Sequence, residues 1–443
     1  MKRRLLYGVV LAALGVNLLV GAWIFQSSAV AAEKESPYAS LKLFSYALER
    51  VRKDYVDGQK LTYQDLVYAA LKGMLNTLDP HSEFMDPEKY KELQNDTQGA
   101  FGGVGLIVQM KDGFITVVAP MTNTPGFKAG IRTGDRIVKI AGTSTTHMAT
   151  DEAVRILRGE PGTKVTVTIS RPSTGETRDY ELTRASIIVE MVTDLHGGKD
   201  FPVDEHHIGY VRLTQFGEKT SDDLEQAIKK LKHEGMKAMI MDLRLNPGGL
   251  LDQAEKVCAK FLPKGQLVVS TEGRDPSENK RLVAHGRDEL EGMPLVVLVN
   301  VGSASASEIV AGCLQDLKRA VILGETTFGK GSVQSILQLE DGSALRLTTA
   351  KYYTPSHKVI HKVGITPDVV VAMTPEEEDA LRIQRTPGGV ESLGEAERAR
   401  VQAIGDPQLE RATDLLKGIL LFAQRSPAPE THPPGGGKLA AAR

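Results

Sequence analysis

The spacing of hydrophobic residues changes twice along this chain of 443 residues, and the three patterns require more than one structural unit. From Tyr38 to about Leu93, apolar residues recur at helical spacing. Between Gly99 and Thr183 the pattern is that of short strands in a compact β-rich module. From Ile188 to Ala372 strands alternate with helices, which favours a layered core. The chain is therefore predicted to be α/β, in a multi-domain α+β arrangement.

Turn and helix-start signals divide these regions further. Asp86-Pro87 predicts the start of a helix, because proline suits the first helical position. Asp341-Gly342 predicts a hairpin turn. Short helices are expected at Pro125–Ala129 and Thr150–Leu157 of the β-rich module. In the α/β region the expected strands are Ile208–Leu213, Ala238–Leu243, Leu295–Val299, Val321–Leu323, Val333–Leu339 and Leu345–Tyr353, and the expected helices are Ser221–His233, Leu250–Phe261 and Ala304–Leu317.

Charge and cysteine content exclude several classes of protein. Lys plus Arg is 54 and Asp plus Glu is 56, a net charge of −2. This balance argues against a general nucleic-acid binder, which would carry a basic excess. The two cysteines, Cys258 and Cys313, cannot form a disulfide framework or a cysteine-rich zinc site.

The N-terminal sequence is typical of an export signal, although a buried core helix is the alternative. Lys2, Arg3 and Arg4 precede an apolar run from Leu5 to Phe25, followed by the small residues 29–32. As a helix the run would be about 31 Å long, at ~1.5 Å per residue. It therefore fits either a cleaved signal peptide or an uncleaved membrane anchor. Both outcomes place the rest of the chain outside the cytoplasm, because the positive end stays inside.

Three segments carry residues suited to catalysis. Asn300–Glu308 follows a buried strand and opens a helix, where a serine gains from unpaired N–H groups, although serine is also an ordinary N-cap. Lys330 stands between two glycines, so crowding by the backbone could lower its pKa and make it a base, although it also fits a surface loop. Met241–Leu250 reads as strand, glycine turn and helix, either a plain turn or an oxyanion hole. Gln334, four residues after Lys330, could hold the lysine by a hydrogen bond without adding charge.

Histidine and metal chemistry have weaker support. The histidines with any context, His81, His206, His207, His357 and His361, lie in predicted loops or at strand ends. No H-E-x-x-H motif and no carboxylate–histidine cluster with metal-ligand spacing occurs. No metal, nucleotide or other cofactor is therefore expected.

The blocks D-L-R-x-N-P-G-G, S-A-S-A-S-E and T-F-G-K-G-x-V-Q, which follow one another in that order along the chain, resemble those of the carboxy-terminal processing, or tail-specific, proteases. The resemblance covers roughly residues 38–376 and implies a crotonase-like protease core with a Ser–Lys catalytic dyad. It implies Ser305 as the nucleophile, Lys330 as the base and Gln334 as the residue that orients Lys330. The implied oxyanion hole pairs the N–H of Ala306 with that of Gly249 or Gly248.

The β-rich module resembles a PDZ domain, through the A-G-I-x-x-G-D-x-I signature at Ala129–Ile137. The implied peptide site is a glycine-rich loop whose N–H groups bind a terminal carboxylate, beside a strand edge that receives the peptide. This loop comprises Gly102, Gly103, Val104, Gly105 and Leu106. The resemblance also suggests that the module gates the protease. Arg158 could couple the two, although it also fits an exposed loop arginine.

The sequence thus predicts a serine endopeptidase that cleaves the C-terminal region of extracytoplasmic proteins, in the bacterial periplasm or cell envelope. The expected partners are substrates with exposed apolar C-termini, a possible adaptor and no nucleic acid, with homo-oligomers forming through the helical arms. Three alternatives stay open: a non-catalytic PDZ scaffold, a PDZ-containing trypsin-like protease and a Ser/His enzyme on the same core. The second is disfavoured because no G-x-S-G-G motif occurs. The expected segments are a signal or anchor (1–33), an N-terminal helical region (34–98), a PDZ domain (99–184), a protease core (185–376), a C-terminal helical region (377–425) and a flexible tail (426–443).

Overall fold

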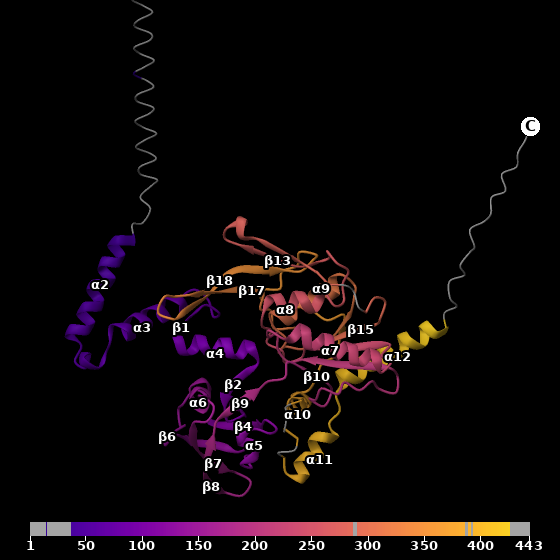
Figure 1. Ribbon diagram of the computed structural model, residues 1–443, viewed down its shortest axis with the longest axis horizontal. Helices are drawn as coiled ribbons and strands as arrows, with labels where there is room; N and C mark the ends of the chain where they lie inside the picture. The colour runs from indigo at the N-terminus through magenta and orange to yellow at the C-terminus, as the bar shows by residue number, and fades with distance from the viewer. Residues whose placement is uncertain (1–14, 16–36, 287–289, 386–388, 391–392, 426–443) are drawn as a thin grey trace, which may run out of the picture. The chain divides into compact units, whose positions relative to one another are not determined.

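The chain divides into two compact units, Met1–Phe84 and Met85–Arg443. A short strand, β1 (Glu83–Met85), spans the boundary between them in the sequence. The computed structural model describes residues 15, 37–286, 290–385, 389–390 and 393–425 (Figure 1). Apart from residue 15, the predicted signal or anchor (1–33) lies outside the described residues, and so does the predicted tail (426–443). Within the described part of the chain, no helix combines the length and apolar character needed to cross a bilayer.

The first unit is helical, as predicted. It contains α2 (Pro37–Asp54), a 3₁₀ turn (Gly58–Lys60) and α3 (Tyr63–Asn76). Thr62 and Asp65 form a reciprocal capping box that fixes the start of α3. The Arg52 guanidinium lies 4.4 Å from the centre of the Tyr63 ring, so it connects α2 to α3.

The PDZ-like module is built on a sheet with strand order β3-β4-β5-β7-β8. It is preceded by α4 (Pro87–Gln98), which begins at the predicted Asp86-Pro87 signal. The edge strand β3 is next in the chain to the glycine-rich loop. Its elements are β3 (Leu106–Lys111), β4 (Phe114–Pro120), α5 (Pro125–Lys128), β5 (Arg136–Ile140), β6 (Thr143–Ser144), α6 (Thr150–Leu157), β7 (Lys164–Arg171) and β8 (Glu176–Thr183), with β2 (Ala100–Gly103) pairing β9 (Ala185–Ile188) outside this sheet.

The α/β core is built on a second sheet, with strand order β10-β11-β12-β15-β16-β19. Its strands are β10 (Val192–Thr193), β11 (Ile208–Leu213), β12 (Ala238–Asp242), β15 (Leu295–Val299), β16 (Val321–Gly324) and β19 (Val369–Val370). From β11 to β19 neighbouring strands are parallel. Because β12 and β15 are neighbours, the loops after their carboxyl ends meet at one edge of the sheet, the usual place for a site in such folds.

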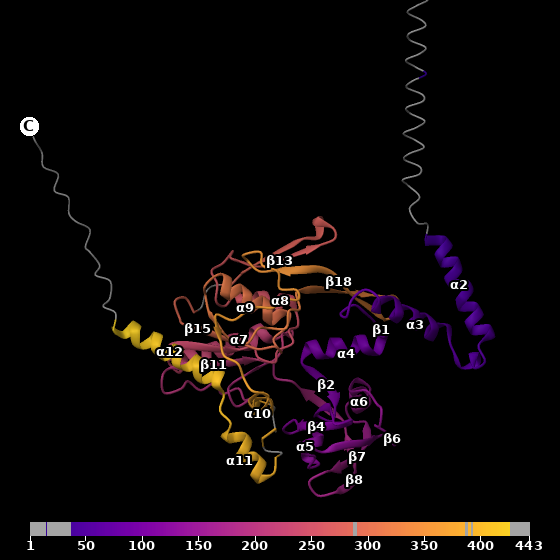
Figure 2. The ribbon, with the colours of Figure 1, turned by 180° about the vertical axis from the view of Figure 1, so that it is seen from behind.

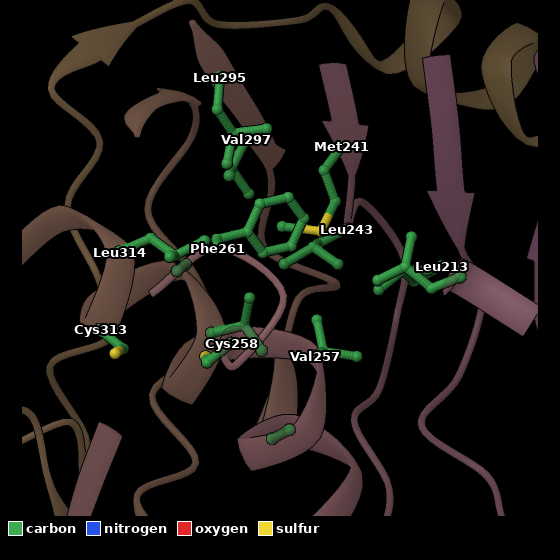
Figure 3. Packing of buried hydrophobic residues seen from close by; sticks show 14 of the residues in the cluster. Leu213, Met241, Leu243, Val257, Cys258, Phe261, Leu295, Val297, Cys313 and Leu314 are labelled. Atoms are coloured by element: carbon green, nitrogen blue, oxygen red, sulfur yellow. The ribbon is translucent and has the colours of Figure 1, made fainter. Parts of the chain in front are cut away.

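Helices cover both faces of this sheet (Figures 1 and 2). Side chains of a strand alternate between faces, so Met239 and Met241 of β12 join one core cluster while Ala238 and Ile240 join another. The first cluster includes residues of α7 (Thr220–His233), α8 (Leu251–Cys258) and α9 (Ala306–Asp316), and the second includes residues of α12 (Pro407–Arg425). Figure 3 shows the first cluster, in which the buried Phe261 ring packs among strand and helix residues.

A further antiparallel sheet includes β17 (Ser332–Gln338), the strand that begins two residues after Lys330. It also contains β13 (Leu267–Gly273), β14 (Lys280–Val283) and β18 (Ala344–Tyr353). The predicted hairpin is confirmed, because β17 pairs with β18 and Gly342 has a φ of 86°. The sequence did not predict β13 and β14. The C-terminal region is helical as expected, with α10 (Pro375–Arg385), α11 (Glu395–Ala403) and α12.

Candidate active site

Ser305 lies where the loop after the buried strand β15 passes into α9. Its φ is 56°, an unfavourable backbone conformation for a residue with a Cβ atom, which persists because its surroundings hold it. Strained turns from strand to helix present the nucleophilic serine in α/β-hydrolases. The residue is 8 % exposed and borders a cleft of about 390 Å³. The cleft is lined by Gln215, Pro247, Gly248, Gly249, Leu250, Leu251, Ser305, Lys330, Val333, Gln334 and Tyr352.

The two neighbouring serines have structural roles. Ser303 is fully buried, and its hydroxyl accepts from the Asn300 N–H (3.0 Å) and donates to the Leu243 carbonyl (2.8 Å). Ser307, also fully buried, donates to the Asn246 carbonyl (2.9 Å). These bonds connect the serine loop to the loop after β12. Of the three serines in the block, Ser305 is the one that lines the cleft.

Lys330 lines the same cleft from the segment between β16 and β17. Burial lowers its pKa below the usual 10.5, and the positive charge of Arg346 adds to this effect, while Glu308 opposes it. The flanking glycines are required by close packing: a Cβ on Gly331 would lie 2.2 Å from the backbone nitrogen of His361. The predicted crowding of the lysine segment by backbone is therefore present.

Glu308 joins the serine and lysine segments. Its Oε2 accepts from the backbone N–H of Ser305 (2.8 Å) and of Lys330 (2.9 Å). Its Oε1 accepts from the Gly329 N–H (2.6 Å) and the Thr327 hydroxyl (2.5 Å). Burial raises the pKa of Glu308, and these hydrogen bonds oppose that rise. One buried carboxylate thus fixes both segments.

The glycine turn after β12 lies against Ser305. A Cβ on Gly248 would lie 2.8 Å from that of Ser305 and 2.9 Å from the Ala306 nitrogen, so a side chain there would displace the site. The Gly248 N–H donates to the Asn246 side chain (2.9 Å). Gly249, with a φ of 146°, packs against the backbone of Phe216. For the Gly249 N–H, no acceptor is found among the described residues.

Gln334 lines the cleft together with its neighbour Val333, although adjacent strand residues normally face opposite sides. A register shift in the β17–β18 pairing between these two residues accounts for this. The amide nitrogen of Gln334 donates to the hydroxyls of Ser332 (2.9 Å) and Thr348 (3.3 Å). Its amide oxygen is therefore the atom that could serve Lys330.

The predicted peptide site lies in the PDZ-like module. Gly103, Val104, Gly105 and Leu106 line a small cavity of about 80 Å³ with residues of α6, next to the edge strand β3. Gly102 lines a neighbouring cavity with residues of α4. Arg158 borders both cavities; it forms an ion pair with Asp96 of α4 (3.0 Å), and its guanidinium lies 4.4 Å from the Phe101 ring centre.

Two residues of the site, Glu308 and Tyr352, were not predicted from the sequence. The S-A-S-E spacing from Ser305 to Glu308 is a helix capping signal that could have identified Glu308. Tyr352, which also lines the cleft, comes from β18, and no local motif marks it. None of the histidines considered from the sequence is among the lining residues of this cleft.

Comparisons with known proteins agree with the predicted family. The model of peptidase family S41 matches residues 207–371, and a PDZ domain model matches residues 116–171. A carboxy-terminal-processing protease of Bartonella bacilliformis is 42 % identical over 94 % of this chain and 97 % of its own length. Carboxy-terminal processing protease CtpA of Bacillus subtilis is 37 % identical over 83 % of this chain and 78 % of its own length. A solved structure, a photosystem II D1 C-terminal processing protease, is 30 % identical over 78 % of this chain and 97 % of its own, with a TM-score of 0.48.

Fold and domain matches together define an α/β peptidase with an inserted PDZ domain. The chain belongs to the carboxy-terminal processing proteases of peptidase family S41. This membership removes the trypsin-like alternative that the sequence left open.

Proposed function

We propose that this peptidase cleaves the C-terminal region of extracytoplasmic proteins with a Ser305–Lys330 dyad. The observation that carries the proposal is that both residues line one cleft while a single carboxylate, that of Glu308, binds the backbone of each. The lowered pKa of Lys330 supports its role as a base, because a base must be able to lose its proton.

In the proposed reaction, Oγ of Ser305 attacks the scissile carbonyl carbon and its proton passes to the neutral Nζ of Lys330. The tetrahedral intermediate collapses, the carbon–nitrogen bond breaks, and Lys330 returns the proton to the leaving amine. Water then hydrolyses the acyl ester, with Lys330 again taking and returning a proton. Gln334 orients Lys330 through its amide oxygen.

The oxyanion of the intermediate is bound by the N–H groups of Ala306 and Gly249. Gly249 is favoured over Gly248 because the N–H of Gly248 already donates to Asn246. Gly248 supports the site differently, by allowing the turn to approach Ser305 closely.

The PDZ domain recognises the substrate's terminal carboxylate with the segment Gly102–Leu106, in which Val104 and Gly105 connect β2 to β3, and the apolar tail adds to the edge of β3. Arg158 couples this recognition to proteolysis. It borders the cavity next to β3 and forms an ion pair with Asp96 of α4, a helix outside the PDZ sheet.

The N-terminal and C-terminal helical regions mediate homo-oligomers. In α2 the apolar side chains of Leu41, Leu43 and Phe44 are exposed and could pack against a second copy. An adaptor could present substrates, and the N-terminal segment 1–33 exports or anchors the protein.

The experiment compares parent, Ser305→Ala and Ser303→Ala proteins on an unstructured polypeptide with an apolar C-terminus. Ser305→Ala should abolish cleavage and labelling by a fluorophosphonate while the protein stays folded. Ser303→Ala should keep the labelling. Cleavage by Ser305→Ala at the parent rate would overturn the proposal. An unlabelled parent that binds the tail without cutting it would restore the scaffold alternative. Proteomics of the cell envelope with and without Ser305→Ala would then identify substrates.

A further inference from the structure

Tyr352 is fixed next to the lysine segment by its backbone. Its N–H donates to the carbonyl of Gly331, the residue after Lys330, at 2.8 Å. On the other side β18 pairs with β13, with Tyr352 opposite Thr271. A residue held on both sides in this way presents its side chain in one direction.

The Tyr352 side chain connects the core to the cleft. It is 5 % exposed and belongs to the main hydrophobic cluster, yet it also lines the cleft with Ser305 and Lys330. A buried phenol normally hydrogen-bonds to a polar group. Here the phenol shares the cleft with the Ser305 side chain, whose hydrogen bond to it opposes the rise in the phenol's pKa that burial causes.

The chemistry of the two hydroxyls determines which one donates. A serine hydroxyl has one proton to donate and two lone pairs that accept. Burial raises the pKa of Tyr352 to about 12, so the phenol keeps its proton at neutral pH. A phenol that donates to Oγ leaves the serine's own proton free for another acceptor.

We propose that Tyr352 is a further catalytic residue, whose phenol donates a hydrogen bond to Oγ of Ser305 and thereby directs the serine proton toward Nζ of Lys330. This inference rests on the proposed Ser–Lys dyad. The phenol keeps its proton throughout the reaction. When Oγ becomes an ester oxygen it is a weaker acceptor, so the phenol acts mainly before and during attack.

The neighbouring tyrosine provides a matched control. Tyr353 follows Tyr352 in the same strand, and its ring stacks on His357 with the centroids 4.5 Å apart. Since successive strand residues face opposite sides, Tyr353 points away from the cleft, and it is not among the cleft-lining residues.

The test measures kcat and KM of the full-length chain for Tyr352→Phe and Tyr353→Phe, on an unstructured peptide with an apolar C-terminus. Tyr352→Phe should lower kcat at least tenfold with KM within twofold of the parent, and slow fluorophosphonate labelling of Ser305 by a similar factor. Tyr353→Phe should behave as the parent. Parental kcat and labelling rate in folded Tyr352→Phe would overturn the inference. An active parent that loses activity with Ser305→Ala but not with Tyr352→Phe would leave the dyad standing.

A second measurement covers the case in which Tyr352→Phe fails to fold. Fluorinated tyrosines at position 352 keep the ring and the hydroxyl but lower the phenol pKa. Because a phenolate cannot donate, kcat/KM should acquire an alkaline decline that moves to lower pH with increasing fluorination. A pH profile identical to that of the parent at every degree of fluorination would also overturn the inference.

Discussion

The backbone N–H groups of Ser305 and Lys330 share one acceptor, Oε2 of Glu308, at 2.8 and 2.9 Å. These two residues, the proposed nucleophile and the proposed base, come from loops that follow neighbouring parallel strands, β15 and β16. A common acceptor holds these loops at a fixed separation, which a proton transfer between their side chains requires. Glu308 therefore supports the geometry of the site, and its charge also opposes the lowering of the Lys330 pKa.

Replacing this carboxylate should impair activity. In Glu308→Gln the amide nitrogen cannot accept hydrogen bonds, so two of the four donors lose their acceptor. A buried donor left unpaired costs about 1–3 kcal/mol. We expect kcat/KM to fall about 100-fold and unfolding to require less denaturant. The control is Glu255→Gln, a buried carboxylate of α8 that accepts from the His285 N–H, which should keep parental kcat/KM. Equal activity of both variants would contradict the role given to Glu308.

The rate should depend on the ionisation of Lys330. Burial, with Arg346 nearby, lowers the pKa of Lys330 below 10.5, and the neutral amine is the proposed base. We therefore expect kcat/KM to rise with pH as Lys330 loses its proton, and to be unaffected by metal chelators. Lys330→Arg should be inactive at every pH because a guanidinium stays protonated. Substantial cleavage by Lys330→Arg would return the search to a Ser/His mechanism.

Burial of Lys330 also predicts a pH-dependent stability difference. Because its folded pKa is lowered, the folded state binds this proton less tightly than the unfolded state does. The cost of burying the charge is therefore fully present below the folded pKa and disappears as the pH rises toward 10.5. Lys330→Met should be more stable than the parent at neutral pH, by a margin that shrinks toward pH 10.5. Chemical denaturation at several pH values measures this, and a constant margin would contradict it.

The proposed peptide site of the PDZ domain can be tested by substituting two glycines of similar backbone conformation. Gly105 has a φ of 70°, and a Cβ there would lie 2.3 Å from the Thr124 side chain. Gly113 has a φ of 78° with open space around it. Both alanine variants carry the strain of a positive φ, about 1–2 kcal/mol, but only Gly105→Ala should distort the loop. Calorimetry should show about tenfold weaker binding of an apolar peptide to Gly105→Ala, and parental affinity for Gly113→Ala.

The loss of affinity in Gly105→Ala should depend on the terminal carboxylate of the peptide. An amidated peptide should bind weakly to the parent and to both variants, since it lacks the charge that the loop amides are proposed to recognise. Equal affinity of the parent for the acid and the amide would refute the carboxylate site.

Local signals accounted for most elements because the hydrophobic periods are clear. The strands Ile208–Leu213 and Leu295–Val299 and the helix Thr150–Leu157 have the predicted bounds. The strand β13 was not predicted, because its apolar run is only three residues long, Leu267–Val269, and the rest of the strand is set by pairing with β18. Strand pairing between distant segments determines such elements, and the sequence does not show it locally.

The same reason limits what could be predicted of the site. Ser305, Lys330 and the glycine turn are in recognisable blocks, so their grouping could be inferred from a family resemblance. Tyr352 reaches the cleft through pairing of β18 with its neighbours, which no spacing reveals. The proposal of Gly249 rather than Gly248 as oxyanion donor depends on the Gly248–Asn246 hydrogen bond, which only the structure shows.

A buried ionic network connects the C-terminal region to the strand before the glycine turn. Arg244 is 2 % exposed and donates to Asp242 (2.7 Å) and to Asp406 (2.8 Å), which lies just before α12. Burial alone would raise the pKa of Asp242, but the charge and hydrogen bonds of Arg244 outweigh it and hold the pKa well below 3.8. The network therefore favours the folded state only while both carboxylates are ionised.

Removal of the arginine should leave two buried carboxylates without their main partner. We expect Arg244→Met to lower the free energy of unfolding at neutral pH by about 3–5 kcal/mol, as for other broken buried pairs. Since the folded pKa of Asp242 is depressed, this difference should be fully present above pH 3.8 and diminish as the pH falls below it. The control is Arg382→Met, whose ion pair with Asp379 is largely exposed and should contribute about 0–1 kcal/mol. Denaturant titrations at neutral and acidic pH measure both, and similar losses for the two variants would show that the network does not stabilise the fold.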